Sequence, residues 1–455
     1  MQRLGMRLCA WIVVFALAGA VQAQTGAASV MLGMGDSIGA GVQSADTSWR
    51  TQPYSYLNFI AAQVDTPFSL PLILSGPFGK VYDTSSRSRL FPFVAGSNLA
   101  VAGANVNSLL NDRADAINED EIGSETDLIL FPRLGSQLEI AESIGAPFIV
   151  CWIGNNDILS AAIAFDKLDA SQLTPVAEFS TDFAEIVRRL NALGSPVVFA
   201  NIPDITNIGF LLDRQDMIRF VGSDFGLAEG DFTSIVAMLL IRLGLADGSI
   251  LQYPGFVLDA GEVELIRQRT EVFNQIIEDE VTGIGMPVVD VNGLFDFLAA
   301  NPPVFSDVTL TPRFLGGLFS LDGVHPSNLA HALLANAFIE TINAHFQTDI
   351  PPINEAALKL IFLTDPFVDK DGDGRVTGRV LAGLLETFGP VFGISGDIND
   401  FIPDFFRAGI DKDLGTEFKR QFQRLPGAES RSGREWNQED VIEAFKRIFD
   451  LEIHP

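Results

Sequence analysis

The chain has 455 residues, of which 47% are hydrophobic and 19% charged, so it can bury a large core and is not a largely disordered protein. Its formal net charge of -28 repels phosphate backbones, which argues against a nucleic-acid partner. The 36 Phe, against 4 Tyr and 4 Trp, favour buried or lipid-facing aromatic surface.

The first 23 residues have the pattern of a signal peptide. Arg3 and Arg7 form a positive start, residues 9–18 are apolar, and we expect cleavage after Ala23. The alternative is a retained membrane anchor, but the apolar stretch is short for a membrane span. We therefore expect a secreted or periplasmic protein, with no transmembrane segment in the mature chain.

Short apolar runs alternate with helical patterns in the first three quarters of the chain. The runs are 28–34, 147–153, 196–201 and 286–291. This alternation predicts an α/β fold with a parallel sheet covered on both faces. Two longer stretches, 51–97 and 206–285, do not fit a minimal alternation. The second contains an expected apolar helix at 232–245. We expect insertions around the site, either as a lid or acyl-chain wall or as ordinary packing.

Ser37 follows the first apolar run, in the sequence GDS at 35–37. Gly35 and Gly39 flank it, so the chain can turn tightly from a strand into a helix and present the hydroxyl. Reactive groups of parallel sheets lie at the carboxyl ends of the strands. Ser37 is therefore the candidate nucleophile.

A serine nucleophile needs a base, and the chain has only four histidines. His325 lies just before an expected helix, and Asp322, three residues earlier, can accept from its second ring nitrogen. His331, His345 and His454 lack such a setting and are interpreted as structural. The oxyanion of an acyl transfer also needs donors. We expect them from the Ser37 amide, from Gly103, and from the side chain of Asn156 in GNND at 154–157.

These residues resemble the blocks of the SGNH, or GDSL, hydrolase family. Its first block matches GDSI at 35–38, its glycine block matches Gly103, its third block matches GNND, and its last block matches DGVH at 322–325. The resemblance implies a flavodoxin-like three-layer α/β/α sandwich over 24–347. It also implies Ser37 as nucleophile, Asp322 as acid, His325 as base, and Ser37, Gly103 and Asn156 as oxyanion donors. No cofactor is implied for catalysis.

Two other hydrolase classes fit less well. GDSIG at 35–39 also satisfies the nucleophile elbow of α/β-hydrolases, but that elbow follows several strands, whereas Ser37 follows the first. A zinc hydrolase would need a metal-binding histidine pattern that the chain lacks. Cys151 lies in an apolar run, and we interpret it as a buried core thiol.

A break at 348–352, which we expect to be a linker, separates the hydrolase region from residues 353–455. Asp369, Asp371 and Asp373, followed by Arg375 and Thr377, have the spacing of a calcium loop. Val380 replaces the bidentate glutamate at the twelfth position. The expectation is a small all-α, EF-hand-like domain that binds Ca²⁺ weakly. The alternatives are a solvated acidic turn and a dockerin-like adhesion module.

The sequence thus predicts a secreted serine hydrolase that cleaves carboxylic esters through an acyl-enzyme on Ser37. Lipid or other hydrophobic acyl esters are the expected substrates, because of the phenylalanine content and the apolar insertion. The alternatives are a carbohydrate acetylesterase, a thioesterase, or a surface-attached module whose C-terminal domain binds a protein partner of unknown identity.

Overall fold

The computed structural model describes residues 31–44, 46–75, 87–164, 166–242, 246–370 and 376. Its centre is a sheet of parallel strands in the order β1 (Met31–Gly35), β4 (Phe148–Trp152), β5 (Val197–Ala200) and β9 (Val288–Val289). A parallel bridge from Gly33 to Asn98 extends the sheet on the other side of β1. Counted along the chain, the spatial order is 2-1-3-4-5, as in flavodoxin. The prediction of an α/β fold with a parallel sheet is confirmed.

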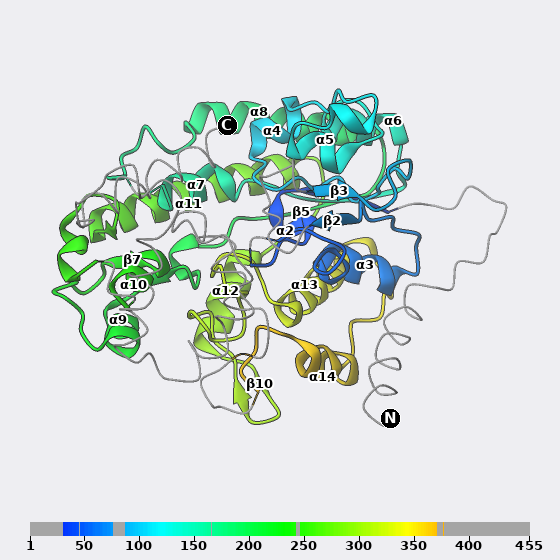
Figure 1. The fold of residues 1–455 in the computed structure, drawn as a ribbon. Coiled ribbons are helices and arrows are strands. Elements are labelled where there is room, and N and C mark those ends of the chain that lie inside the picture. Colours follow the sequence, from blue (N-terminus) through cyan, green and yellow to red (C-terminus); the bar gives the residue numbers. More distant parts are fainter. Residues whose placement is uncertain are drawn as a thin grey trace.

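The strands are buried on both faces, because their side chains alternate between two apolar cores. Ile149 and Cys151 belong to the larger core, and Val150 and Trp152 to the smaller one. Helices α4 (Val106–Asn111), α6 (Gln137–Ile144), α8 (Val176–Ala192) and α11 (Ala260–Gly283) contribute to the larger core, and α3 (Tyr56–Val64) and α13 (Asn328–Phe346) to the smaller one (Figure 1). Both faces of the sheet are therefore covered by helices.

Shorter elements connect this framework. The helices are α2 (Ser37–Ala40), α5 (Glu125–Leu130), α7 (Asn156–Ala162) and α12 (Val291–Ala300). Two antiparallel pairs accompany them: β2 (Ile73–Ser75) with β3 (Arg87–Arg89), and β10 (Val304–Phe305) with β11 (Val308–Thr309).

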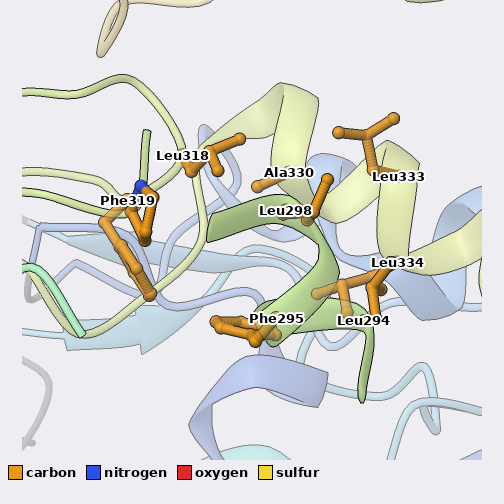
Figure 2. A pocket seen from close by; sticks show the side chains of 9 residues that line it. Leu294, Phe295, Leu298, Leu318, Phe319, Ala330, Leu333 and Leu334 are labelled. Atoms are coloured by element: carbon orange, nitrogen blue, oxygen red, sulfur yellow. The ribbon is translucent and has the colours of Figure 1, made fainter. Parts of the chain in front are cut away.

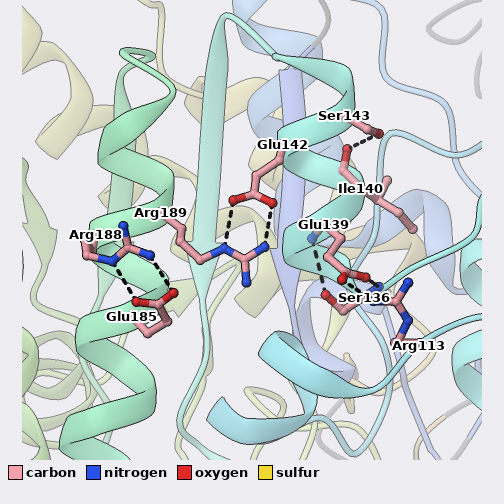
Figure 3. Close-up of polar contacts among 9 residues, drawn as sticks. All are labelled: Arg113, Ser136, Glu139, Ile140, Glu142, Ser143, Glu185, Arg188 and Arg189. Carbon is pink, nitrogen blue, oxygen red and sulfur yellow. Dashed lines mark hydrogen bonds and ion pairs between the residues drawn. The ribbon is translucent and has the colours of Figure 1, made fainter.

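Polar side chains join α6 to α8 on the outer surface (Figure 3). Arg189 makes a two-pronged contact with Glu142, with nitrogen–oxygen distances of 2.8 and 2.5 Å. At the start of α6, the Ser136 hydroxyl accepts from the amide of Glu139, and the Glu139 carboxylate accepts from the amide of Ser136. This capping box fixes where α6 begins, and the next residue, Gln137, contacts the strand that leads to the candidate nucleophile.

Of the second expected insertion, residues 260–283 are helix α11, which helps to cover the sheet, and residues 211–258 form a small module beside the sheet, with α9, α10 and β7 grouped together (Figure 1). The module contains β6 (Leu211–Leu212), α9 (Arg214–Val221), β7 (Phe232–Ser234), α10 (Ile235–Arg242) and β8 (Val257–Leu258). The expectation of a helix from residue 232 was wrong over its first turn. Residues 232–234 form the central strand of a three-stranded antiparallel sheet, and the Thr233 hydroxyl donates to the Phe256 carbonyl at 2.6 Å.

Beyond the expected linker, α14 (Glu355–Thr364) packs against α13 (Figure 1). Phe362 and Val368 are buried in one cluster with Leu329 of α13. The Asp365 carboxylate, fully buried, accepts from the Leu329 amide at 2.8 Å. Residues 353–368 are thus part of the packing around α13.

Two predicted segments lie outside the described residues: the signal peptide at 1–23 and most of the expected EF-hand-like domain, residues 371–375 and 377–455. Both stay predictions. Within the ranges that the structure describes, no helix has the length and apolar character needed to cross a membrane.

Candidate active site

Ser37 stands at the carboxyl end of β1, as the first residue of α2. The preceding Asp36 caps this turn, because its carboxylate accepts from the Ile38 amide at 3.0 Å. The Asn155 side chain donates to the other Asp36 oxygen at 2.8 Å. Burial raises the pKa of Asp36 and the Asn155 hydrogen bond lowers it; burial is the larger effect, so the pKa is raised to about 6. The GDS and GNND segments, at the ends of neighbouring strands, are therefore directly joined.

Gln137 holds the end of β1 from the opposite direction. Its side-chain oxygen accepts from the Gly35 amide and its nitrogen donates to the Gly35 carbonyl, both at 2.9 Å. Gln137 is 2% exposed, so these contacts are shielded from water. The amide side chain clamps the backbone two residues before Ser37.

The serine and histidine predicted from the two ends of the domain lie within hydrogen-bond distance. The Ser37 hydroxyl oxygen is 2.9 Å from Nε2 of His325, and Nδ1 of His325 is 2.7 Å from an Asp322 oxygen. With the Nδ1 proton donated to Asp322, Nε2 is left as an acceptor for the serine proton. The histidine side chain is 15% exposed, so a substrate can reach this chain of contacts.

Asp322 is buried and well supplied with donors. One of its oxygens accepts from the amides of Val324 and His325, each at 2.9 Å. Burial by itself would raise the pKa of Asp322, but the His325 ring and these hydrogen bonds lower it to about 2. Asp322 is therefore ionised at neutral pH and can stabilise a protonated His325.

Two residues that follow the nucleophile contact the segment around His325. We call residues 320–327 the histidine loop; α13 begins directly after it. The Gln43 amide donates to the Pro326 carbonyl at 3.2 Å and to the Asn328 side chain at 2.8 Å. The Ser44 hydroxyl accepts from the Leu321 amide at 3.0 Å. These contacts join two segments of the chain that are almost 300 residues apart.

Two of the expected oxyanion donors, Gly103 and Asn156, lie on segments that are hydrogen-bonded to each other. Gly103 has a φ of 80°, a backbone conformation that suits glycine. The Asn156 side-chain amide donates to the Ala104 carbonyl at 2.8 Å, and an Asp157 oxygen accepts from the Val106 amide at 3.0 Å. An asparagine amide carries two protons, so the contact with Ala104 leaves one proton of Asn156 for a ligand.

A family model of the GDSL-like lipase/acylhydrolases matches residues 31–338, about two thirds of the chain. The chain belongs to this family. It is accordingly a carboxylic ester hydrolase, as the resemblance predicted. Among curated proteins, none matches the chain.

Solved structures similar to this GDSL hydrolase include three ester-cleaving or hydrolase proteins. LAE5, an α/β hydrolase enzyme from the metagenome of Lake Arreo, is 15% identical, covering 69% of this chain and 94% of its own (TM-score 0.34). Axe2, an acetylxylan esterase from Geobacillus stearothermophilus, is 14% identical over 70% of this chain and 96% of its own (TM-score 0.35). Phospholipase A1 from Streptomyces albidoflavus is 16% identical over 70% of this chain and 100% of its own (TM-score 0.30).

The GDSL hydrolase also has a small apolar pocket between α12, α13 and the segment that leads to the histidine loop (Figure 2). Leu318 and Phe319, which directly precede the loop, form one wall, and helices α12 and α13 form the others. All the lining side chains are apolar: Leu294, Phe295, Leu298, Pro312, Leu318, Phe319, Ala330, Leu333 and Leu334.

The other titratable candidates are buried in structural settings. His331 accepts from the Tyr56 amide at 3.3 Å, and burial lowers its pKa to about 3, so it is neutral. Burial raises the pKa of the Cys151 thiol to about 12, which makes it unreactive, as expected for a core cysteine.

The predicted calcium loop is only partly described. Asp369 lies within the described residues, and Asp371, Asp373, Arg375 and Thr377 lie outside them. Over the described ranges, no group of three or more His, Cys, Asp or Glu side chains could hold a metal ion. Calcium binding therefore stays a prediction.

Sequence reasoning missed the residues that support the site: Gln137, Gln43, Ser44, Ser320 and Asp157. Asp157 lies within the GNND block, so its position offered a signal. Gln137, Gln43 and Ser44 act across separations of 100 to nearly 300 residues. Ser320 lies two residues before Asp322, but its hydroxyl is held by the distant Ser44, so no local pattern identifies any of these residues.

Proposed function

We propose that this GDSL hydrolase cleaves esters of hydrophobic acyl groups by a two-step route through an acyl-enzyme on Ser37. The observation that carries the proposal is the continuous contact from Ser37 through His325 to Asp322, with distances of 2.9 and 2.7 Å. A serine, a base and an orienting carboxylate in this order activate the hydroxyl for attack on a carbonyl.

In the first step, Nε2 of His325 takes the serine proton while the Ser37 oxygen bonds to the carbonyl carbon. The developing oxyanion is held by the amides of Ser37 and Gly103 and by the Asn156 side chain. The histidine then gives its proton to the departing alcohol oxygen, which leaves the acyl group on Ser37. In the second step a water molecule gives a proton to His325 and attacks the acyl carbonyl carbon. The histidine then returns the proton to the Ser37 oxygen as the carboxylic acid leaves. Asp322 stays ionised throughout, because its pKa is near 2.

The 36 phenylalanines of the chain and the apolar helix α10 support a hydrophobic acyl group, and the small pocket of Figure 2 adds apolar surface near the loop of His325. Its wall residues Leu318 and Phe319 are four and three positions before Asp322, so one wall of the pocket leads directly into the segment that carries Asp322 and His325. Burial of each additional methylene stabilises a bound acyl chain by about 0.8 kcal/mol. We therefore expect medium or long acyl chains to be preferred over acetyl.

The experiment compares wild type with Ser37→Ala on p-nitrophenyl acetate, butyrate, octanoate and palmitate, with an acetylated xylan and an acyl thioester as further substrates. Removal of the nucleophile should lower kcat by about 10⁴-fold or more without changing the fold. Ser143→Ala is the matched control, because it removes a hydroxyl that only contacts the Ile140 carbonyl of α6.

Full activity of Ser37→Ala would overturn the mechanism. A kcat/KM that is highest on the acetyl esters or on the thioester would keep the serine mechanism but reject the hydrophobic acyl substrate.

A further inference from the structure

Ser320 lies behind the catalytic carboxylate, on the side away from His325. Its hydroxyl is 3.1 Å from the Asp322 oxygen Oδ1, to which it donates, whereas Asp322 binds the histidine through Oδ2. The Ser320 oxygen in turn accepts from the Ser44 amide at 2.9 Å. Ser320 is 2% exposed, so both contacts are made in the protein interior.

The backbone of Ser320 is held as firmly as its side chain. Its amide donates to the His325 carbonyl at 2.7 Å, and its carbonyl accepts from the Gly323 amide at 3.0 Å. Ser44, the partner of its hydroxyl, has a φ of 51°, a left-handed conformation that is costly for a residue other than glycine. The hydroxyl of Ser320 is therefore fixed in one direction, toward Asp322.

These contacts close a ring around the catalytic groups. The Val42 amide donates to the Ser37 carbonyl at 2.9 Å, which folds the segment after the nucleophile back toward Ser44. From Ser44 the ring continues through Ser320 and Asp322 to His325, which returns to Ser37. The amides of Val324 and His325 hold the carboxylate within its own loop, whereas Ser320 ties it to the segment of the nucleophile.

We propose that Ser320 is a positioning residue for ester hydrolysis, in which its hydroxyl, oriented by Ser44, fixes the Asp322 carboxylate against His325. This inference rests on the proposed function, since it concerns the same serine mechanism.

Two effects follow from the loss of this hydroxyl. The carboxylate loses a donor and can rotate away from the histidine, which lowers kcat more than it raises KM, because Ser320 does not touch substrate. A carboxylate that is no longer held against the ring stabilises the protonated imidazole less, so the acidic limb of the pH–rate profile moves to lower pH.

The test measures kcat and KM of Ser320→Ala on the best p-nitrophenyl ester, from about pH 5 to about pH 9. We expect kcat to be about tenfold lower, KM to stay within about twofold, and the midpoint of the acidic limb to move to lower pH. Ser320→Cys, which nearly keeps the volume but donates weakly, should change in the same direction if Ser320→Ala does not fold.

Ser327→Ala is the control for a purely structural effect. Ser327 is also fully buried beside the same loop, and its hydroxyl donates to the Gly317 carbonyl at 2.8 Å without contact to Asp322. Its loss should reduce thermal stability and leave the acidic limb in place.

Wild-type kcat and pH profile in a folded Ser320 variant would overturn the inference while leaving the proposed function intact. A lower kcat with an unmoved acidic limb would also overturn the inference, because that is the result expected of a purely structural change. If the wild-type chain shows no hydrolysis that depends on Ser37, the proposed function fails and this inference fails with it.

Discussion

Asp157 has a buried carboxyl group and directly follows Asn156, one of the expected oxyanion donors. It is 3% exposed, and burial raises its pKa from 3.8 to about 7, against the lowering effect of the Val106 amide. A folded chain with this raised pKa binds more protons than the unfolded chain between about pH 4 and pH 7. The stability from this group is therefore fully present below pH 4 and is lost as the pH rises toward 7.

Asp157→Asn should consequently flatten the pH dependence of stability. The wild-type free energy of unfolding should fall, through this group, by up to about 1.4 kcal/mol per pH unit in that window, and the variant should lack this contribution. Urea unfolding at several pH values from 4 to 8 measures both slopes. Asp112→Asn, on an exposed residue, is the control. Parallel curves for wild type and Asp157→Asn would contradict the prediction.

At the residue scale, the sequence predicted the side chains of the proposed triad but not the residues that hold them in place. Ser37, Asp322 and His325 were found because each lies in a short motif at a strand end or helix start, which local patterns identify. Gln137 makes two hydrogen bonds to Gly35, 102 residues away in the sequence, and the Ser320 hydroxyl is held by the amide of Ser44, 276 residues away. Such contacts depend on the folded path of the chain, so one sequence cannot reveal them.

At the scale of elements, the insertion module presses against the histidine loop at Gly323. The Phe210 amide donates to the Gly323 carbonyl at 2.8 Å. Gly323 has a φ of 71°, and a Cβ there would lie 2.5 Å from the Phe210 nitrogen and 2.7 Å from Cδ1 of Ile235. Phe210 precedes β6 and Ile235 begins α10, so the module fixes the loop from outside.

Gly323→Ala should therefore damage both stability and catalysis. Gly222→Ala is a matched control, because Gly222 ends α9 with a similar φ of 78° and has no atom within 4 Å of its Cβ position. Both variants should lose about 1 kcal/mol of stability from the left-handed backbone. Gly323→Ala alone should lose more than this, and its kcat should fall because Asp322 and His325 are displaced.

Denaturant unfolding and kcat measurements on the two variants separate these effects. Equal losses of stability, together with an unchanged kcat in Gly323→Ala, would show that the module does not support the loop.

The buried strands were predicted well, because continuous apolar runs between helical patterns are typical of parallel sheets. The observed β1 begins at Met31 and β4 ends at Trp152, close to the expected runs at 28–34 and 147–153. The conformation of the apolar stretch from residue 232 was harder to predict, because a short apolar run is compatible with either a strand or a buried helix. Pairing of Thr233 with strands on both sides decides its conformation, and that pairing is a tertiary contact.

At the scale of the whole molecule, residues past the expected linker contribute to the catalytic end of α13. Ser327, at the start of this helix, accepts from the Ala330 amide, and Asp365 accepts from the Leu329 amide. His325 lies two residues before Ser327, so Asp365 braces the backbone that carries the proposed catalytic base. The break at 348–352 suggested a domain boundary near residue 350. The sequence pattern did not show that residues beyond this break are buried against α13.

Two truncations test this arrangement. A chain that ends after Val376 keeps every described contact, including the packing of Val376 against the main core, and should hydrolyse esters with wild-type kcat. A chain that ends after Ile350 loses Phe362, Val368 and Asp365 and exposes Leu329. Each large apolar side chain lost from burial costs about 1.5–3 kcal/mol, so this chain should be unstable by several kcal/mol or insoluble.

Thermal unfolding and ester hydrolysis of the two truncated chains test the arrangement, and Asp365→Asn in the longer chain tests the contribution of the Asp365 carboxylate. That single change should reduce stability by about 1–3 kcal/mol, because the Leu329 or Phe367 amide loses a buried acceptor. If the chain ending after Ile350 unfolds at the same temperature as the one ending after Val376 and has the same kcat, residues 353–368 do not brace α13, and the hydrolase domain is complete without them.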